Sequence, residues 1–193
     1  MNNAFIFLFR IATDLYVLTF ILRLILQGVG ADAHNPLSQF ILRVTNPVVI
    51  RVRRYIPTIK GWDAATITII LFLELLASIV LLNVICIGMP GIGESIGLAI
   101  LRSAYLLLNT YFFLILAYVI ISWVGSGGYN PLVAVLVRVV EPVLRPFRKY
   151  IPAIGGIDLS PLFAAIAIQF GMQLLPFGYV LKGMVCLSPA SLI

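Results

Sequence analysis

The charged residues of the apolar segments are the first that could do chemistry. Asp14, Arg23, Glu74 and Arg102 each stand within a long hydrophobic stretch. A charge inside lipid is costly, so such side chains face other protein groups, water or the interface. The interpretation we favour is structural pairing of Arg10 with Asp14. Glu74 would then pair with Arg23 or Arg102. The alternative is a path for ions or protons through Asp14 and Glu74.

The sequence lacks the patterns of catalytic and metal sites. It has one histidine, His34, which alone cannot build a metal site or a catalytic triad. Cys86 and Cys186 have no metal-ligand spacing, and we expect buried, inert thiols rather than a disulfide. The glycine-rich stretch at 88–93 lacks the lysine of a phosphate-binding loop and indicates a turn. We therefore predict no enzyme activity, no metal and no cofactor.

The composition indicates the elements that must position these residues. Of 193 residues, 62% are hydrophobic and 10% are charged, whereas soluble domains have about 25% charged residues. The sequence therefore predicts an all-α integral membrane protein. We expect four transmembrane helices, at about residues 3–27, 64–87, 96–123 and 161–185, each long enough for a hydrocarbon core of about 30 Å. Pro176 predicts a kink or an early end in the last helix.

One segment of the chain occurs twice without a gap. Residues 35–63 and 130–158 align at an offset of 95, and the match extends into the helices before them. We therefore divide the chain into two parallel halves, 1–95 and 96–193, made by tandem duplication. Each half is expected to be a helix, amphipathic interfacial helices and a second helix. The matched motif residues are Asn35, Pro36, Pro47, Pro57 and Asp63, and then Asn130, Pro131, Pro142, Pro152 and Asp158.

The prolines predict the local structure of each segment. Asn35 is placed to cap a short amphipathic helix that ends near Pro47, and a second short helix is expected to follow it. Asp63 and Asp158 are expected to cap the spanning helices after them. The apolar face of the first helix is expected to lie in the lipid interface. A re-entrant loop is the alternative, which we favour less because lipid cannot satisfy backbone groups freed by proline. That apolar face consists of Leu37, Phe40, Ile41 and Val44.

Basic residues are concentrated in the two repeated segments. These segments hold nine of the thirteen lysines and arginines, and each base near an anionic leaflet contributes about 1 kcal/mol. By the positive-inside rule, both segments are cytoplasmic and both chain ends are periplasmic. We predict that the basic residues bind anionic headgroups or a membrane partner, and not nucleic acid. The candidate residues are Arg43, Arg51, Arg53, Arg54, Arg138, Arg145, Arg148 and Lys149.

The repeated segments also carry a family resemblance. Asn-Pro at 130–131, Arg-Lys-Tyr-Ile-Pro at 148–152 and Gly-x-Asp-Leu-Ser-Pro at 156–161, with their counterparts from residue 35 onward, resemble the repeated motif of the YggT family of bacterial integral membrane proteins. The first copy departs from the motif at Arg51, where the second copy has Pro146, and at 65–66. The resemblance covers nearly the whole chain and implies the two-repeat form of proteobacterial inner membranes. It also implies links to osmotic stress and potassium uptake. For single-copy relatives it implies links to nucleoid or thylakoid organisation and to haem attachment.

These features together predict a non-enzymatic, multi-pass protein of the bacterial inner membrane. The leading hypothesis is an accessory, assembly or scaffold factor that acts through its two cytoplasmic amphipathic segments, with a role in osmotic or envelope stress. The alternative is a component of ion transport or osmotic homeostasis that uses the intramembrane charges. The expected partners are membrane lipids, with another membrane protein or a second copy of the chain as further candidates.

Overall fold

The protein is helical throughout almost all of the chain that the structure describes. The computed structural model describes residues 2–58, 61–87, 91–124, 130–151, 158–177 and 185–186. Its helices are α1 (Asn2–Gly28), α2 (Pro36–Arg53), α3 (Ala64–Ile85), α4 (Ile92–Val124), α5 (Pro131–Tyr150) and α6 (Ser160–Gln173). Two short strands, β1 (Cys86–Ile87) and β2 (Val185–Cys186), pair antiparallel. Apart from this pair, the described residues confirm the predicted helical class.

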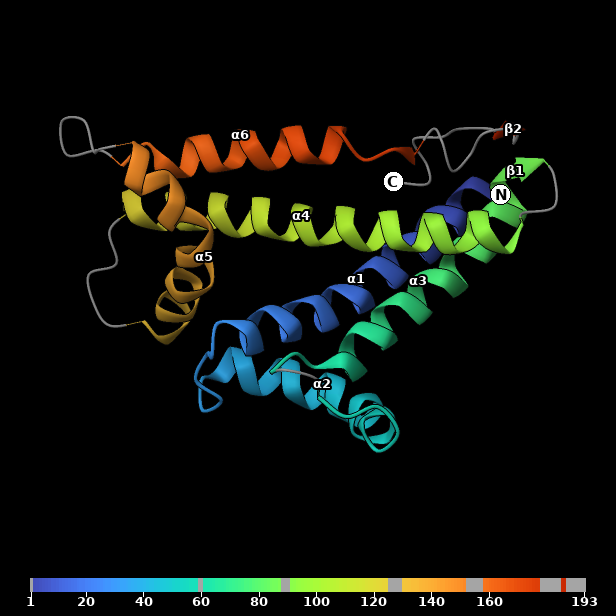
Figure 1. Ribbon diagram of the computed structural model, residues 1–193, viewed down its shortest axis with the longest axis horizontal. Helices are drawn as coiled ribbons and strands as arrows, with labels where there is room; N and C mark the ends of the chain where they lie inside the picture. The colour runs from blue at the N-terminus through green and yellow to red at the C-terminus, as the bar shows by residue number, and fades with distance from the viewer. Residues whose placement is uncertain are drawn as a thin grey trace.

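The helices form two groups that follow the two halves of the sequence (Figure 1). α1 packs against α3, and α2 lies across one end of that pair. α4 packs against α6, and α5 lies across the corresponding end of the second pair. α3 also packs along α4, which joins the two groups. The N-terminus and β1 lie at the end of the molecule opposite α5 (Figure 1).

Three of the described helices are long and apolar enough to cross a membrane. Their apolar stretches are Ala4–Gly28, Ala64–Val84 and Ile92–Ser122, of 25, 21 and 31 residues. At 1.5 Å per residue, even 21 residues cover about 30 Å. α6 has 14 residues, or about 21 Å, and ends shortly before Pro176, so the helix has the early end that this proline predicts. Residues 178–184 of the predicted fourth span lie outside the described ranges.

α2 and α5 correct the prediction of two short helices in each repeated segment. Each is one continuous helix, with Pro47 inside α2 and with Pro142 and Pro146 inside α5. An internal proline removes a backbone hydrogen bond and costs about 3 kcal/mol, but the burial of one face of the helix offsets that loss. The buried residues of α2 are Ser38, Ile41, Thr45 and Val49. Those of α5 are Val135, Val139, Val140 and Leu144.

The apolar face of α2 therefore packs largely on the protein, which corrects its predicted position in lipid. Ile41 and Val49 are fully buried and join a core with Val17 and Phe20 of α1. Phe40 is 62% exposed and lies on the outer side of the helix. α2 thus has an inner face that fixes it to α1 and α3 and an outer face that mixes apolar and basic residues. A second core repeats the arrangement in the other half, with Ile115, Val140, Leu144, Ala164 and Ile168.

Asparagine caps begin α2 and α5, as predicted. The Asn35 side chain accepts a hydrogen bond from the Leu37 N–H at 3.0 Å, and Asn130 accepts one from the Leu132 N–H at 2.9 Å. Asn35 also donates to the carbonyl of Pro131 at 2.7 Å. This hydrogen bond joins the start of α2 to the start of α5, so that these two helices, which we call the surface helices, meet at these ends.

The two aspartates of the motif occupy different positions relative to the helices after them. Asp63 directly precedes α3 and accepts a hydrogen bond from the Thr66 hydroxyl at 2.7 Å. Gly61, with φ of 85°, makes the turn before it, in a region that favours glycine. Asp158 lies one residue further from its helix, because Leu159 is the N-cap of α6, and it accepts from the Ser160 N–H at 2.9 Å. The predicted cap position thus holds for Asp63 and is displaced for Asp158.

Candidate functional site

The first half contains a buried group of polar side chains where α1, α2 and α3 meet, which we call the first-half cluster. Its members are Arg23, Thr45, Asn46, Arg53, Asp63 and Thr66. Arg53 Nη2 donates to Asp63 Oδ2 at 2.6 Å, and Arg23 Nε lies 3.7 Å from the same oxygen. Arg23 and Asp63 are almost completely buried, with side chains 3% and 2% exposed. One carboxylate therefore serves two cations.

Hydrogen bonds from α1 to α2 complete the first-half cluster. Arg23 Nη1 donates to Thr45 Oγ1 and to Asn46 Oδ1, each at 2.7 Å. These contacts place Arg23 away from Glu74. Of the two arginines proposed as partners of Glu74, Arg102 is the one that pairs with it. The effect of the Arg23 contacts is to hold the middle of α2 against the C-terminal half of α1.

The second half holds a corresponding second-half cluster between α4, α5 and the start of α6. Its members are Tyr118, Glu141, Arg148 and Asp158. Arg148 Nε donates to Asp158 Oδ2 at 2.9 Å and Nη2 donates to the Tyr118 hydroxyl at 2.9 Å. Its Nη1 also bonds Glu141. The side chains are partly open to solvent, at 31% for Arg148, 36% for Asp158 and 47% for Glu141.

The pKa values of the motif carboxyls reflect these contacts. Burial raises the pKa of Asp63, but the hydrogen bonds from Thr66 and Arg53 together outweigh burial, and the pKa lies below its usual value. Burial likewise raises the pKa of Asp158, and the bonds from Ser160 and Arg148 bring it below its usual value. Both carboxyls are therefore charged at neutral pH.

The intramembrane charges form a third group, at the crossing of α1, α3 and α4. Arg102 Nε donates to Glu74 at 2.8 Å and its Nη2 donates to Asp14 at 2.7 Å. Arg10 lies 3.6 Å from Asp14 on the same helix. The favoured pair of Arg10 with Asp14 is therefore present, and of the two partners left open for Glu74 the structure has Arg102. The additional contact between Arg102 and Asp14 links α1 to α4.

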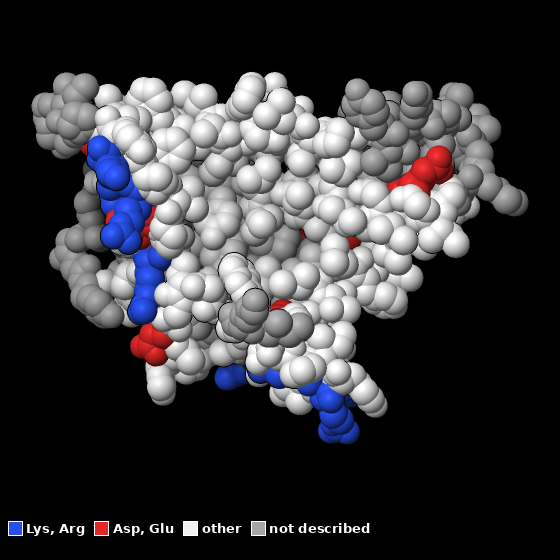
Figure 2. Space-filling view, in the orientation of Figure 1, with Lys and Arg blue, Asp and Glu red and all other residues white. Residues whose placement is uncertain are grey.

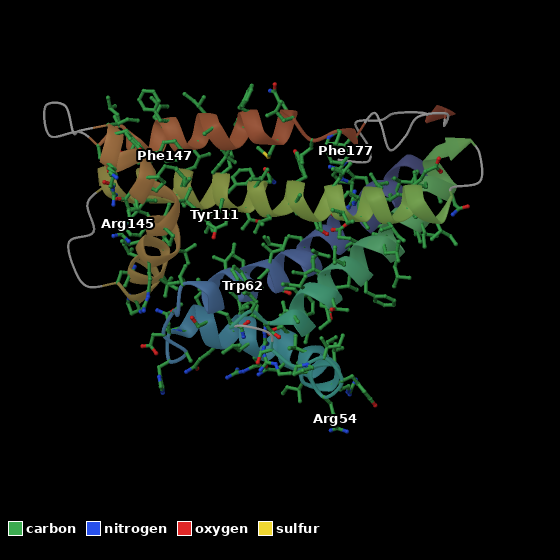
Figure 3. The ribbon with its side chains drawn as sticks, in the orientation of Figure 1. Arg54, Trp62, Tyr111, Arg145, Phe147 and Phe177 are labelled. Atoms are coloured by element: carbon green, nitrogen blue, oxygen red, sulfur yellow. The ribbon has the colours of Figure 1, made fainter. Side chains whose placement is uncertain are left out.

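Six of the eight candidate lipid-binding residues are exposed, and we call them the outer basic residues. They are Arg43, Arg51, Arg54, Arg138, Arg145 and Lys149. Figure 2 shows Lys and Arg gathered over α5 and along the outer side of α2. Arg54 extends away from the end of α2, and Arg145 lies on the outer side of α5 (Figure 3). Arg53 and Arg148 are different, because each is engaged by the aspartate ten residues after it.

Several members of the two clusters could not have been recognised as site residues from one half of the sequence alone. Thr45, Asn46, Tyr118 and Glu141 are ordinary residues of amphipathic or apolar helices. The available signal is the alignment of the halves, where Tyr118 stands in the place of Arg23 and Glu141 in the place of Asn46. Two coordinated changes around a shared Arg–Asp pair indicate a common site with different charge.

A cavity lies beside the first-half cluster, and a groove lies beside Asp14. A cavity of about 200 Å³ lies between the end of α1 and the start of α2, with Arg23, Gln27 and Ser38 among its lining residues. A groove of about 460 Å³ between α1 and α4 is lined by Asp14 and Asn109, which occupy equivalent positions in the halves. Within the described residues, no group of three histidine, cysteine or acidic side chains is placed to hold a metal ion.

Comparisons with known proteins give a consistent result. The CCB3/YggT family model matches residues 2–84 and 97–179, two stretches that are themselves offset by 95 residues. The chain is 40% identical over 170 residues to the uncharacterized protein PA0392 of Pseudomonas aeruginosa, covering 88% of this chain and 86% of the relative. It is 35% identical over 166 residues to the uncharacterized protein YggT of Escherichia coli, covering 86% of each. No solved structure matches.

A plant protein shows a shorter similarity. The YlmG homolog protein 2, chloroplastic, of Arabidopsis thaliana is 31% identical over 78 residues, which are 40% of this chain and 31% of that protein. A match of that length corresponds to less than one half of the molecule.

Proposed function

The chain belongs to the CCB3/YggT family, and on that premise we propose that it is a membrane scaffold or accessory factor whose two surface helices bind anionic lipid headgroups. One observation carries the proposal. The six outer basic residues are exposed on α2 and α5, where Figure 2 shows two groups of Lys and Arg, while Arg53 and Arg148 are bonded to aspartates and fix those helices in place.

The proposed position of α2 and α5 is the cytoplasmic surface of the bacterial inner membrane. In this arrangement α1, α3 and α4 cross the bilayer, and α6 belongs to a fourth crossing. The halves arose by tandem duplication and have the same orientation. The positive-inside rule places the outer basic residues in the cytoplasm and the chain ends in the periplasm.

The outer faces of the surface helices suit the boundary between headgroups and acyl chains. Phe40 and Ile50 of α2 are 62% and 58% exposed, beside Arg43, Arg51 and Arg54. An aromatic residue lies near the C-terminal end of each helix, with Tyr55 shortly after α2 and Tyr150 the last residue of α5. Both are about four-fifths exposed, and such residues favour the membrane interface. This mixture of apolar, aromatic and basic side chains supports an interfacial position over a re-entrant loop.

Electrostatics sets the expected strength of the lipid interaction. Each base at an anionic surface contributes about 1 kcal/mol, and the attraction weakens with salt because the Debye length is about 8 Å at physiological ionic strength. Arg53 and Arg148 contribute little to it, since each is held by the aspartate of its pair. We propose no enzyme activity, and the roles in osmotic or envelope stress that the family resemblance implies stay predictions.

The test is lipid selectivity in bilayers of mixed composition. The full-length protein is reconstituted in zwitterionic lipid with an anionic fraction, and the preference for spin-labelled anionic lipid is measured. We expect a preference in the wild type that falls severalfold when Arg51, Arg54, Arg145 and Lys149 are replaced by glutamine. The matched control replaces the three arginines by lysine, which keeps the charge and the preference. Equal selectivity in the wild type and the glutamine variant would rule the proposal out.

A second candidate function, ion transport, is supported by the groove between α1 and α4. Asp14 lines this groove, and Arg102 forms ion pairs with both Asp14 and Glu74. The ion pairs favour a structural role, because each carboxylate already has an arginine. Ion flux through proteoliposomes separates the two functions. A flux that is abolished by Asp14→Asn while lipid selectivity is kept supports transport, and the absence of flux in the wild type excludes it.

A further inference from the structure

The first-half cluster has more positive charge than its own residues neutralise. Arg23 and Arg53 share the single carboxylate of Asp63. Arg23 and Asp63 are each 3% exposed, whereas the Arg53 side chain is 38% exposed, so it is the charge of Arg23 that solvent does little to screen. A buried charge without a full partner is strongly destabilising. The arrangement therefore lacks one negative charge.

Unbonded polar atoms surround the same place. Among the described residues, Arg23 Nε and Ser38 Oγ are buried and have no hydrogen-bond partner, as is also true of Arg53 Nε and Asp63 Oδ1. Buried polar groups are rarely left without hydrogen bonds. Ser38 is 3% exposed, and it shares with Arg23 the lining of the cavity of about 200 Å³. Two residues that line one hollow thus each have a buried donor without a hydrogen bond.

We propose that this cavity, between the end of α1 and the start of α2, binds a phosphate group. Its oxygens would accept hydrogen bonds from Arg23 and Ser38, the charge-assisted kind that guanidinium and phosphate form well. Ser38 is the third residue of α2, so the positive end of that helix also favours an anion. Arg23 lies five residues before the end of α1, or about 7.5 Å, which is the depth of a headgroup in the proposed orientation.

The second half explains why only one such site is expected. There Tyr118 stands in the place of Arg23, and Glu141 in the place of Asn46. Arg148 therefore has two carboxylates beside it, Glu141 and Asp158, and no cation is in excess. Glu141 provides within the protein the negative charge that the first half is proposed to take from a ligand.

The equivalence of Asn46 and Glu141 gives a test that does not depend on a destabilised variant. Asn46→Glu places in the first half the carboxylate that Glu141 provides in the second, beside Arg23 Nη1. We expect this variant to unfold at a higher temperature than the wild type without phosphate, and to bind phosphate at least tenfold more weakly. Ser38→Ala should weaken phosphate binding by severalfold. Gln39→Glu, which adds the same charge at an exposed position of α2, is the matched control and should resemble the wild type.

The measurement is the unfolding temperature of the full-length protein in detergent, titrated with inorganic phosphate at constant ionic strength. A second arm identifies the source of the phosphate group. Native mass spectrometry from nanodiscs of zwitterionic lipid with an anionic phospholipid shows whether an anionic lipid stays bound in the wild type and is lost in Asn46→Glu. That arm rests on the proposed function, whereas the titration does not. A phosphate effect without retained lipid assigns the site to free phosphate.

The proposal is overturned by either of two results. One is a wild type that shows no phosphate-dependent rise in unfolding temperature and retains no anionic lipid. The other is an Asn46→Glu variant that binds phosphate as well as the Gln39→Glu control does. Glutamine variants of Arg51 and Arg54 keep the phosphate response if the cavity is the site, which separates this proposal from surface binding.

Discussion

The two halves hold the same Arg–Asp pair in opposite electrostatic settings. Arg53 with Asp63 and Arg148 with Asp158 are related by the offset of 95, and in both halves the arginine comes from the end of the surface helix. In the first half a second cation, Arg23, joins the pair. In the second half a second carboxylate, Glu141, does so.

The difference teaches which member of each cluster is indispensable. Where two cations share one carboxylate, the carboxylate is the limiting partner. Where one cation serves two carboxylates, the cation is the limiting partner. The first-half cluster is also the more deeply buried, with the Asp63 side chain 2% exposed against 36% for Asp158, so the removal of one partner costs more there. One backbone arrangement thus tolerates either imbalance.

The largest effect is expected from removing the aspartates. Asp63→Asn leaves the buried Arg23 and the partly exposed Arg53 without a carboxylate, and we expect a loss of about 3–5 kcal/mol in the free energy of unfolding. Asp158→Asn leaves Arg148 with Glu141 near the surface and should cost about 1 kcal/mol or less. Denaturant unfolding of both variants in detergent checks the difference, and equal losses would contradict the comparison.

The order reverses when the arginines are removed. Arg148→Gln leaves Glu141 and Asp158 together without their cation, and it also removes the bond to the Tyr118 hydroxyl. Arg53→Gln leaves Asp63 with Arg23. We expect Arg148→Gln to cost about 1–2 kcal/mol and Arg53→Gln to cost less in the same unfolding measurement. A greater loss for Arg53→Gln would show that Asp63 is not shared by Arg23 and Arg53, or that Arg148 is not shared by Glu141 and Asp158.

A smaller effect is expected from making the second half resemble the first. Glu141→Asn replaces the extra carboxylate by the residue at the equivalent position, Asn46. Because the Glu141 side chain is 47% exposed, the change should be below about 1 kcal/mol. The unfolding temperature measures it, and a fall as large as that of Asp63→Asn would mean that the second-half cluster depends on Glu141.

The smallest effect is a dependence of stability on acid pH. The pKa of Asp63 in the folded protein lies below its ordinary value of 3.8, so protonation is harder in the folded state. Its contribution to stability is complete above that value and is lost as the pH falls through the folded pKa. The unfolding temperature of the wild type should drop in that range more than that of Asp63→Asn. Parallel curves would remove Asp63 as the cause.

The sequence predicted the parts of the fold that depend on local pattern. The apolar lengths of α1, α3 and α4 and the asparagine caps of α2 and α5 follow from composition and spacing. The pair Arg10–Asp14 followed from the cost of charge in lipid, which also predicted that Glu74 pairs with Arg23 or Arg102. These features need no knowledge of which helices meet, whereas the choice of Arg102 for Glu74 does.

The rest depends on tertiary packing. Pro47 suggests a break, but α2 continues through it because Ile41 and Val49 are buried against the spanning helices. Arg53 and Arg54 are adjacent and chemically alike, yet one is bonded to Asp63 and the other is exposed. Only the direction of each side chain on the helix distinguishes them, and that direction is fixed by which face of α2 is buried.

The pair of adjacent bases also provides the most direct test of the central claim, that the outer basic residues bind lipid and the inner arginines hold the fold. Two double variants, Arg54→Gln with Lys149→Gln and Arg53→Gln with Arg148→Gln, remove the same charge from the ends of the same helices. Anionic-lipid selectivity is measured for both at physiological salt, where the Debye length of about 8 Å limits the effect of distant charges. The account predicts a severalfold larger loss for the outer pair. An equal or larger loss for the inner pair would contradict it.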